Sequence, residues 1–126
     1  MENSTMQRGP EQWFLDAHPE RGSVRVQVST GRGLFPVEGA RVEIYRRLGT
    51  EPTVFYEGVT DASGIAEDIR LPALPAGWSQ SAETAGISGT VYQVSVRHPQ
   101  HGTVEGRPVT VFPRIETVLA VSLGAA

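Results

Sequence analysis

The chain has 126 residues, of which 39% are hydrophobic and 20% are charged, and its formal net charge is −3. This length corresponds to one domain that can bury a substantial core, and the small negative charge argues against a nucleic-acid partner. The chain has no cysteine, which excludes disulfides and thiolate metal sites, and no apolar run long enough to form a membrane helix.

Residues 1–22 are polar and irregular except for the apolar group Trp13-Phe14-Leu15. Disordered tails seldom carry three large apolar residues in a row, so we expect an extended N-terminal arm that packs on a surface. Two alternatives remain open: the arm packs on its own domain, or it docks on a neighbouring subunit. No signal peptide is visible in this segment.

From residue 23 onward the chain alternates apolar and polar residues, as in Val24, Val26 and Val28, which is typical of half-buried strands. Pro108 predicts that the sixth strand is an edge strand or carries a bulge, because proline cannot donate a ladder hydrogen bond. A domain over residues 23–126 is therefore expected, an all-β, seven-stranded antiparallel Greek-key sandwich. The seven strands are expected at about 23–29, 40–47, 53–60, 65–71, 90–97, 103–112 and 115–123.

Several turn and strand motifs resemble the transthyretin-like, carboxypeptidase regulatory-like domain family, in its bacterial envelope type. The matching residues are Gly22 and Val24, Pro36 to Val42, Thr60 to Gly64, Leu71 and Leu74, and Tyr92 to Val96. The resemblance covers about residues 22–123 and implies a transthyretin-like sandwich. Most such domains are non-catalytic parts of larger proteins, whereas here the domain carries only an arm.

No catalytic, cofactor or metal site is expected. His98 and His101 flank a turn, and a zinc site would need a third ligand, for which His18 and Glu105 are the candidates. A related sandwich family binds iron through two tyrosines and two histidines, but the tyrosines here are spread over several strands. A hydroxyisourate hydrolase of this fold ends in Tyr-Arg-Gly-Ser, and this chain ends in Leu-Gly-Ala-Ala, so we reject that activity.

The first functional hypothesis is a non-enzymatic structural subunit that self-assembles through its arm and its sheet edges into an extracellular or cell-surface filament, with the cytoplasm not excluded. All eleven basic residues are arginine, which is enriched in interface cores. The expected subunit interface contains Trp13, Phe14, Leu15, Arg41, Tyr45, Arg47 and Arg97.

The alternative hypothesis is an accessory module that binds cell-wall glycan or a surface protein. The long loop 72–89 is rich in glycine, serine and proline, and loops on a rigid sandwich commonly carry recognition. Trp78 is the candidate ligand residue in this loop. A hydrolase is the third and weakest hypothesis.

Overall fold

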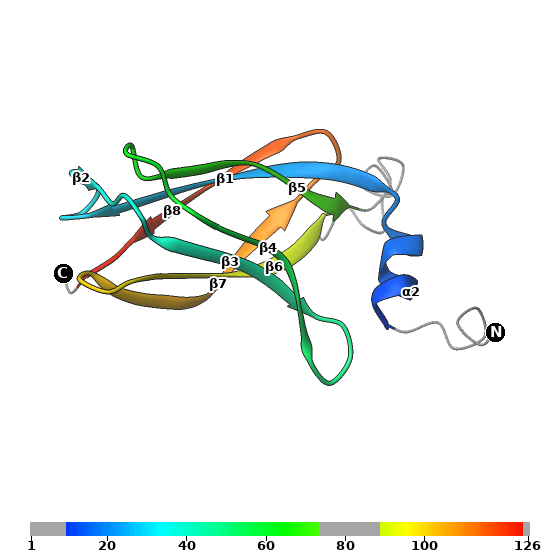
Figure 1. Ribbon diagram of the computed structural model, residues 1–126. Helices are drawn as coiled ribbons and strands as arrows, with labels where there is room; N and C mark the ends of the chain where they lie inside the picture. Colours follow the sequence, from blue (N-terminus) through cyan, green and yellow to red (C-terminus); the bar gives the residue numbers. More distant parts are fainter. Residues whose placement is uncertain (1–9, 74–88, 125–126) are drawn as a thin grey trace.

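The computed structural model describes residues 10–73 and 89–124 as two β-sheets packed face to face, with one short helix at one end (Figure 1). The elements are α2 (Pro10–Ala17), β1 (Glu20–Thr30), β2 (Phe35–Pro36), β3 (Arg41–Arg47), β4 (Pro52–Val59), β5 (Ile65–Ala73), β6 (Thr90–His98), β7 (Gly102–Val111) and β8 (Glu116–Ser122).

In the first sheet β1 pairs with β5, β2 and β8, and in the second sheet the order is β4-β3-β6-β7. The hairpins β3–β4 and β6–β7 are antiparallel. β8 pairs with β1 in parallel, so that the last strand lies beside the first (Figure 1). The two-sheet β-sandwich predicted from the sequence is confirmed.

Alternation along the strands builds the core, because successive side chains point to opposite faces of a sheet. In β1 the valines at 24, 26 and 28 are buried, while Gln27 is exposed. The same pattern in β3 buries Val42 and Ile44. The largest fully buried side chains are Tyr92, Ile44, Ile69, Leu71, Leu123, Val24, Val26, Val28, Val42, Val94, Val96 and Val111.

The turn that follows β4 is joined by hydrogen bonds to the segment that precedes β3. Asp61 Oδ1 accepts hydrogen bonds from the backbone N–H groups of Ser63 (2.9 Å) and Ile65 (3.0 Å), which forms the predicted Asp/Gly turn. The buried Thr60 hydroxyl donates to the carbonyl oxygen of Val37 (2.6 Å) and accepts from the N–H of Ala40 (2.9 Å). Two of the motifs behind the family resemblance, Pro36 to Val42 and Thr60 to Gly64, therefore meet at the Thr60 side chain, and we call these two hydrogen bonds the Thr60 clamp.

Pro108 lies in β7, which is an edge strand, and the β6–β7 register shifts between Val94 and Val96. The prediction from Pro108 is thus confirmed, since an edge strand has one row of backbone groups outside the ladder.

Three expectations need correction. Eight strands are described instead of seven, because residues 35–36 form the short strand β2. The sandwich is not antiparallel throughout, because β8 runs parallel to β1. The N-terminal arm is not extended over its whole length: Pro10–Ala17 is helical, and Glu20 already begins β1.

Candidate functional site

The helix α2 packs against one end of the sandwich, which we call the helix end (Figure 1). Its main anchor is Phe14, which is only 8% exposed. The Phe14 ring lies edge-on to the rings of Phe55 (5.6 Å between centroids) and Tyr92 (6.2 Å). Aromatic rings prefer such edge-to-face contacts. The helix α2 thus packs on its own domain in this structure.

Arg46 of β3 completes the surroundings of the anchor. Its guanidinium carbon lies 5.2 Å from the centroid of the Phe14 ring, within the range of a cation–π contact. The same guanidinium donates to the carbonyl oxygen of Val91, which holds it in place. We call Arg46, Phe55 and Tyr92 together the Phe14 site.

His18 covers the other side of the anchor. Its ring stacks on Phe14 with 3.9 Å between the centroids, and its Nδ1 donates to the Phe14 carbonyl oxygen at 2.7 Å. Since a carbonyl can only accept, the proton of the neutral ring is on Nδ1. Burial lowers the pKa of His18, and the nearby charge of Arg46 lowers it further, against an opposing effect of the hydrogen bond to Phe14. The ring beside Phe14 is therefore preferentially neutral.

The remaining residues of the apolar group differ from Phe14. Leu15 is half-buried against the core, while Trp13 is 65% exposed on the helix. Of the three residues predicted to form a subunit interface, Phe14 is thus occupied within its own chain, and Trp13 is the one that remains largely exposed.

The other predicted interface residues fall into two places. Arg41, Tyr45 and Arg97 share the outer face of the second sheet, where Arg41 pairs in register with Arg97. Their side chains already have partners: Arg41 with Glu57 (3.7 Å), Arg97 with Glu105 (3.9 Å), and the Tyr45 hydroxyl with Ser95 Oγ (3.2 Å). Arg47 is the last residue of β3 and donates to the Thr50 carbonyl oxygen in the turn before β4. The predicted ligand residue Trp78 lies outside the described residues.

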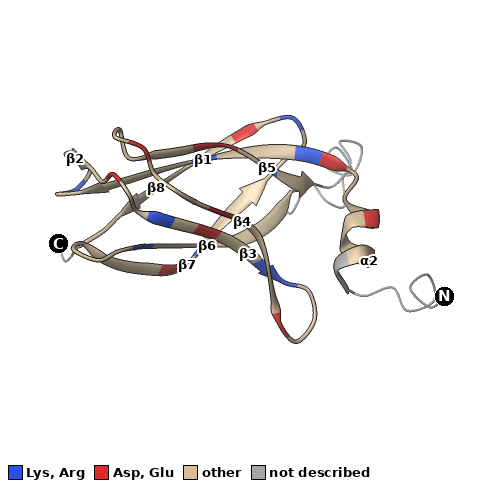
Figure 2. Cartoon of the chain, viewed as in Figure 1, with Lys and Arg blue, Asp and Glu red and all other residues tan. Residues whose placement is uncertain are grey.

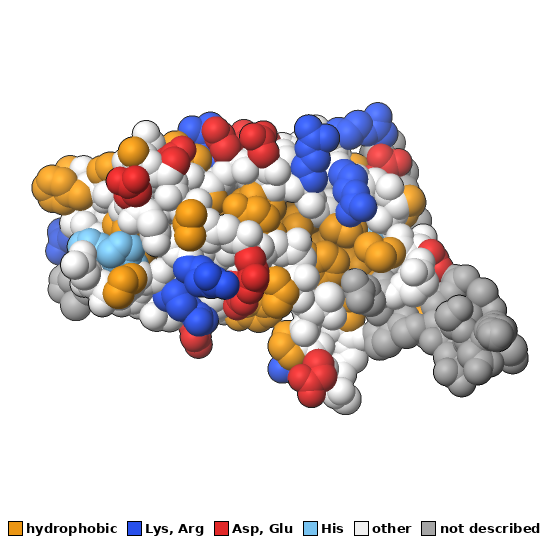
Figure 3. Space-filling model, in the orientation of Figure 1, with side chains coloured by type: hydrophobic (Ala, Val, Ile, Leu, Met, Phe, Trp, Pro, Cys, Tyr) orange, Lys and Arg blue, Asp and Glu red, His pale blue; other side chains and the backbone are white. Residues whose placement is uncertain are grey.

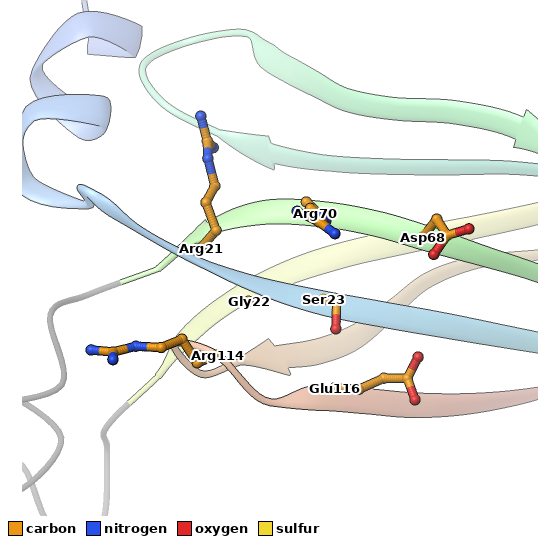
Figure 4. A pocket seen from close by; sticks show the side chains of 7 residues that line it. All are labelled: Arg21, Gly22, Ser23, Asp68, Arg70, Arg114 and Glu116. Carbon is orange, nitrogen blue, oxygen red and sulfur yellow. The ribbon is translucent and has the colours of Figure 1, made fainter.

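A polar hollow of about 370 Å³ lies on the first sheet near the helix end (Figure 4). Its centre is Ser23, which pairs in register with Arg70 on one side and Glu116 on the other. The short serine between two long side chains creates the depression. Its lining residues are Arg21, Gly22, Ser23, Asp68, Arg70, Arg114 and Glu116.

The side chains around this hollow do not converge on one point. Arg21 and Arg114 point in different directions, and Asp68 and Glu116 lie on opposite sides of Ser23 (Figure 4). Acidic and basic residues are also interspersed along the strands of both sheets (Figure 2). The hollow therefore has the character of a solvated, charged sheet face, and no histidine is among the residues that line it.

The histidines and tyrosines are distributed over different parts of the fold. His98 and His101 lie together at the β6–β7 turn, with 4.8 Å between their rings, and His98 Nδ1 accepts from the N–H of Gln100. The Tyr92 hydroxyl donates to the Pro72 carbonyl oxygen (2.6 Å) in the core, where burial raises its pKa. Within residues 10–73 and 89–124, no three histidine or acidic side chains gather as a metal site.

Two features of possible functional use, the Phe14 site and an apolar tip, were not predicted from the sequence. The first is the Phe14 site, whose members are distant in sequence; the only local signal was the spacing of Phe14 and His18, which places both on one face of a helix. The second is the tip, residues 31–35, which consists of the turn after β1 and the first residue of β2, at the end opposite α2 (Figure 1). At the tip Leu34 is 75% exposed and Phe35 is 62% exposed.

No family model and no curated protein match the sequence. Among solved structures, 3-chlorocatechol 1,2-dioxygenase from Rhodococcus opacus 1CP is similar with a TM-score of 0.53 and 13% identity over 85% of this chain, which spans 61% of that protein. The 5-hydroxyisourate hydrolase of Klebsiella pneumoniae has a TM-score of 0.42 and 13% identity, over 80% of this chain and 86% of that one. A 9R-lipoxygenase from Cyanothece PCC8801 has a TM-score of 0.40 and 15% identity, over 85% and 17%.

The similarity to the dioxygenase shows the fold alone, a two-sheet β-sandwich. These structural neighbours are enzymes, and at such identities their activities do not transfer to this chain. No helix in the described part of the chain is long and apolar enough to span a membrane.

Proposed function

We propose that this protein is a non-enzymatic structural subunit of the transthyretin-like, carboxypeptidase regulatory-like type, which self-assembles end to end into a filament at the cell surface. The family assignment is supported by the Thr60 clamp, which joins two of its turn motifs. The loop around Trp78 lies outside the described residues, and a binding role for it stays a prediction.

The observation that carries the proposal is the exposure of large apolar side chains at both ends of the long axis. Trp13 is 65% exposed at the helix end, and Leu34 (75%) and Phe35 (62%) are exposed at the tip. Figure 3 shows hydrophobic side chains at the extremity of the molecule where the tip lies. Adhesive surfaces at two opposite ends suffice for a linear polymer, whether like ends or unlike ends meet.

The sheet edges offer lateral contacts between such polymers. β4 is an edge strand, and Val54 and Val59 are both exposed on it. An edge strand presents unpaired backbone N–H and C=O groups that another strand can use. Arg41 lies beside this edge, in register with Val59, so part of the predicted interface borders it.

The test is particle size across a concentration series, by analytical ultracentrifugation with negative-stain microscopy. The wild-type chain should form elongated particles that lengthen with concentration. The double substitution Leu34→Ser and Phe35→Ser removes the apolar tip and should limit growth to dimers joined at the helix end.

A matched control replaces exposed apolar residues elsewhere. Ile115→Ser with Val118→Ser changes two residues that are more than half exposed near and on β8, and polymer length should remain that of the wild type. A wild-type chain that stays monomeric up to high micromolar concentration would overturn the proposed function.

A further inference from the structure

The helix α2 is short, with eight residues, and helices this short are marginal in isolation. Among its described side chains, those of residues 12–17, only Phe14 belongs to the buried core and Leu15 is half-buried. Gln12 donates a hydrogen bond to Asp16 within the helix (3.0 Å). The docking of the helix therefore depends mainly on Phe14 in the Phe14 site.

The connection between α2 and the sandwich is short. Only His18 and Pro19 separate the end of the helix from the start of β1. Proline disfavours the helical conformation in the residue before it, so the helix ends here and the chain can extend from this point. In the docked form the chain does not extend here but turns at the end of the helix. The His18 N–H donates to the Leu15 carbonyl oxygen (3.2 Å) in this turn.

From these contacts we infer that two copies of this chain exchange their N-terminal helices, with Phe14 of each copy seated in the Phe14 site of the other. The inference rests on the proposed function and states how two helix ends meet. The occupant is a second copy because the Phe14 site already fits this segment, as seen within one chain.

The exchange conserves every contact of the Phe14 site. The ring contacts with Phe55 and Tyr92 and the cation contact with Arg46 are the same whether Phe14 comes from the same chain or from another. Only the conformation of residues 18–19 and the protein concentration distinguish the two forms. Short connections of this kind are typical of domain-swapped proteins. The exposed face of Trp13 would then lie at the junction between two helix ends, where it gains contact area.

The test is a complementation experiment with full-length chains that all carry Leu34→Ser and Phe35→Ser, so that end-to-end association no longer involves the tip. The helix-deficient chain adds Phe14→Ala and keeps an open Phe14 site. The site-deficient chain adds Phe55→Ala and Arg46→Ala and keeps an intact helix. Mass is measured by light scattering after size exclusion, and native mass spectrometry of the mixture, with one chain isotopically labelled, identifies mixed dimers.

The parent chain should be dimeric, each variant alone monomeric, and the mixture should contain mixed dimers. Both variants must first show the cooperative melting of the parent; Arg46→Glu alone, which leaves the aromatic rings intact, is the second site-deficient variant if the double substitution unfolds. A dimeric parent with no mixed dimers would overturn the exchange and leave the proposed function standing. A monomeric parent would also overturn the exchange. The proposed function is then judged separately, by whether the wild-type chain with its intact tip forms polymers.

Discussion

Thr60 illustrates how one hydroxyl group connects two turns of the fold. It is buried, and it bridges the carbonyl oxygen of Val37 and the N–H of Ala40. Without the hydroxyl both backbone groups would be left without this partner in the interior. An unsatisfied buried polar group costs more than a single hydrogen bond contributes.

We therefore expect Thr60→Val to lower the free energy of unfolding by about 1–3 kcal/mol, since it keeps the shape and removes both hydrogen bonds. Thr60→Ser should lose less because it keeps the hydroxyl. Thr103→Val, on the exposed surface of β7, is the control and should change little. Urea unfolding followed by circular dichroism measures all three; equal midpoints for Thr60→Val and Thr103→Val would contradict the clamp.

Gly64 and Gly39 form a natural comparison, because both have φ +77°. A Cβ on Gly64 would lie 2.4 Å from the Val28 carbonyl oxygen, whereas a Cβ on Gly39 would have no atom within 4 Å. The left-handed conformation costs a non-glycine residue about 1–2 kcal/mol.

Gly39→Ala should therefore destabilise the protein by about 1–2 kcal/mol through conformation alone, and Gly64→Ala by clearly more, because Val28 must also move. Thermal melting of the two variants side by side measures the difference. Equal melting temperatures for the two variants would contradict the close approach of the Val28 carbonyl oxygen to Gly64.

Among the elements, α2 is the one whose docking should depend on pH. Burial, reinforced by Arg46, lowers the pKa of His18 in the docked state, below the ordinary value of about 6.5. Protons therefore bind the undocked state more readily. Docking is fully stable above about pH 6.5 and weakens as the pH falls from there toward the lowered pKa.

The measurement is the emission of Trp13 in a Trp78→Phe background as the pH is lowered. We expect a red shift as α2 undocks, which His18→Gln should abolish by removing the titrating group. His98→Gln, at the β6–β7 turn, should leave the transition unchanged. A transition that survives in His18→Gln would assign the pH dependence to another group.

In the whole molecule, the first and last strands pair in parallel, with Ser23 beside Glu116 and Ser29 beside Ser122. β8 also places Val121 in the core, and Leu123, directly after the strand, is buried there too. The first sheet is therefore complete only after two strands that are far apart in the sequence have met. Proteins dominated by such distant contacts fold slowly, because the entropy of closing a long loop is lost first.

We expect the main refolding phase to take milliseconds to seconds, as measured by stopped-flow fluorescence. Double-jump experiments separate the slower phases due to proline isomers. Val121→Ala in β8 should destabilise the native state, mainly by speeding unfolding if β8 docks last. Refolding within microseconds would show that local contacts, not the β1–β8 pair, limit the rate.

The alternation of apolar and polar residues was sufficient to predict every described strand except the short β2, because the side-chain period of a strand is a local property of the backbone. Turn chemistry at Asp61 and Gly64 and the edge position of Pro108 were predictable for the same reason. The site was predicted only in part: Trp13, Phe14 and Leu15 were identified, but the helix that carries them was not, because eight residues with few apolar positions give a weak helical pattern.

The tertiary structure alone decided which distant segments meet. It brought β8 beside β1 in parallel, and it placed Arg46, Phe55 and Tyr92 around Phe14. It also set α2, the helix that carries Trp13, and the tip at opposite ends of the molecule (Figure 1). A local pattern specifies which face of a strand is buried but not against which partner, since one apolar face can pack on many others. The choice among partners depends on how all the strands and the helix fit together in a single core.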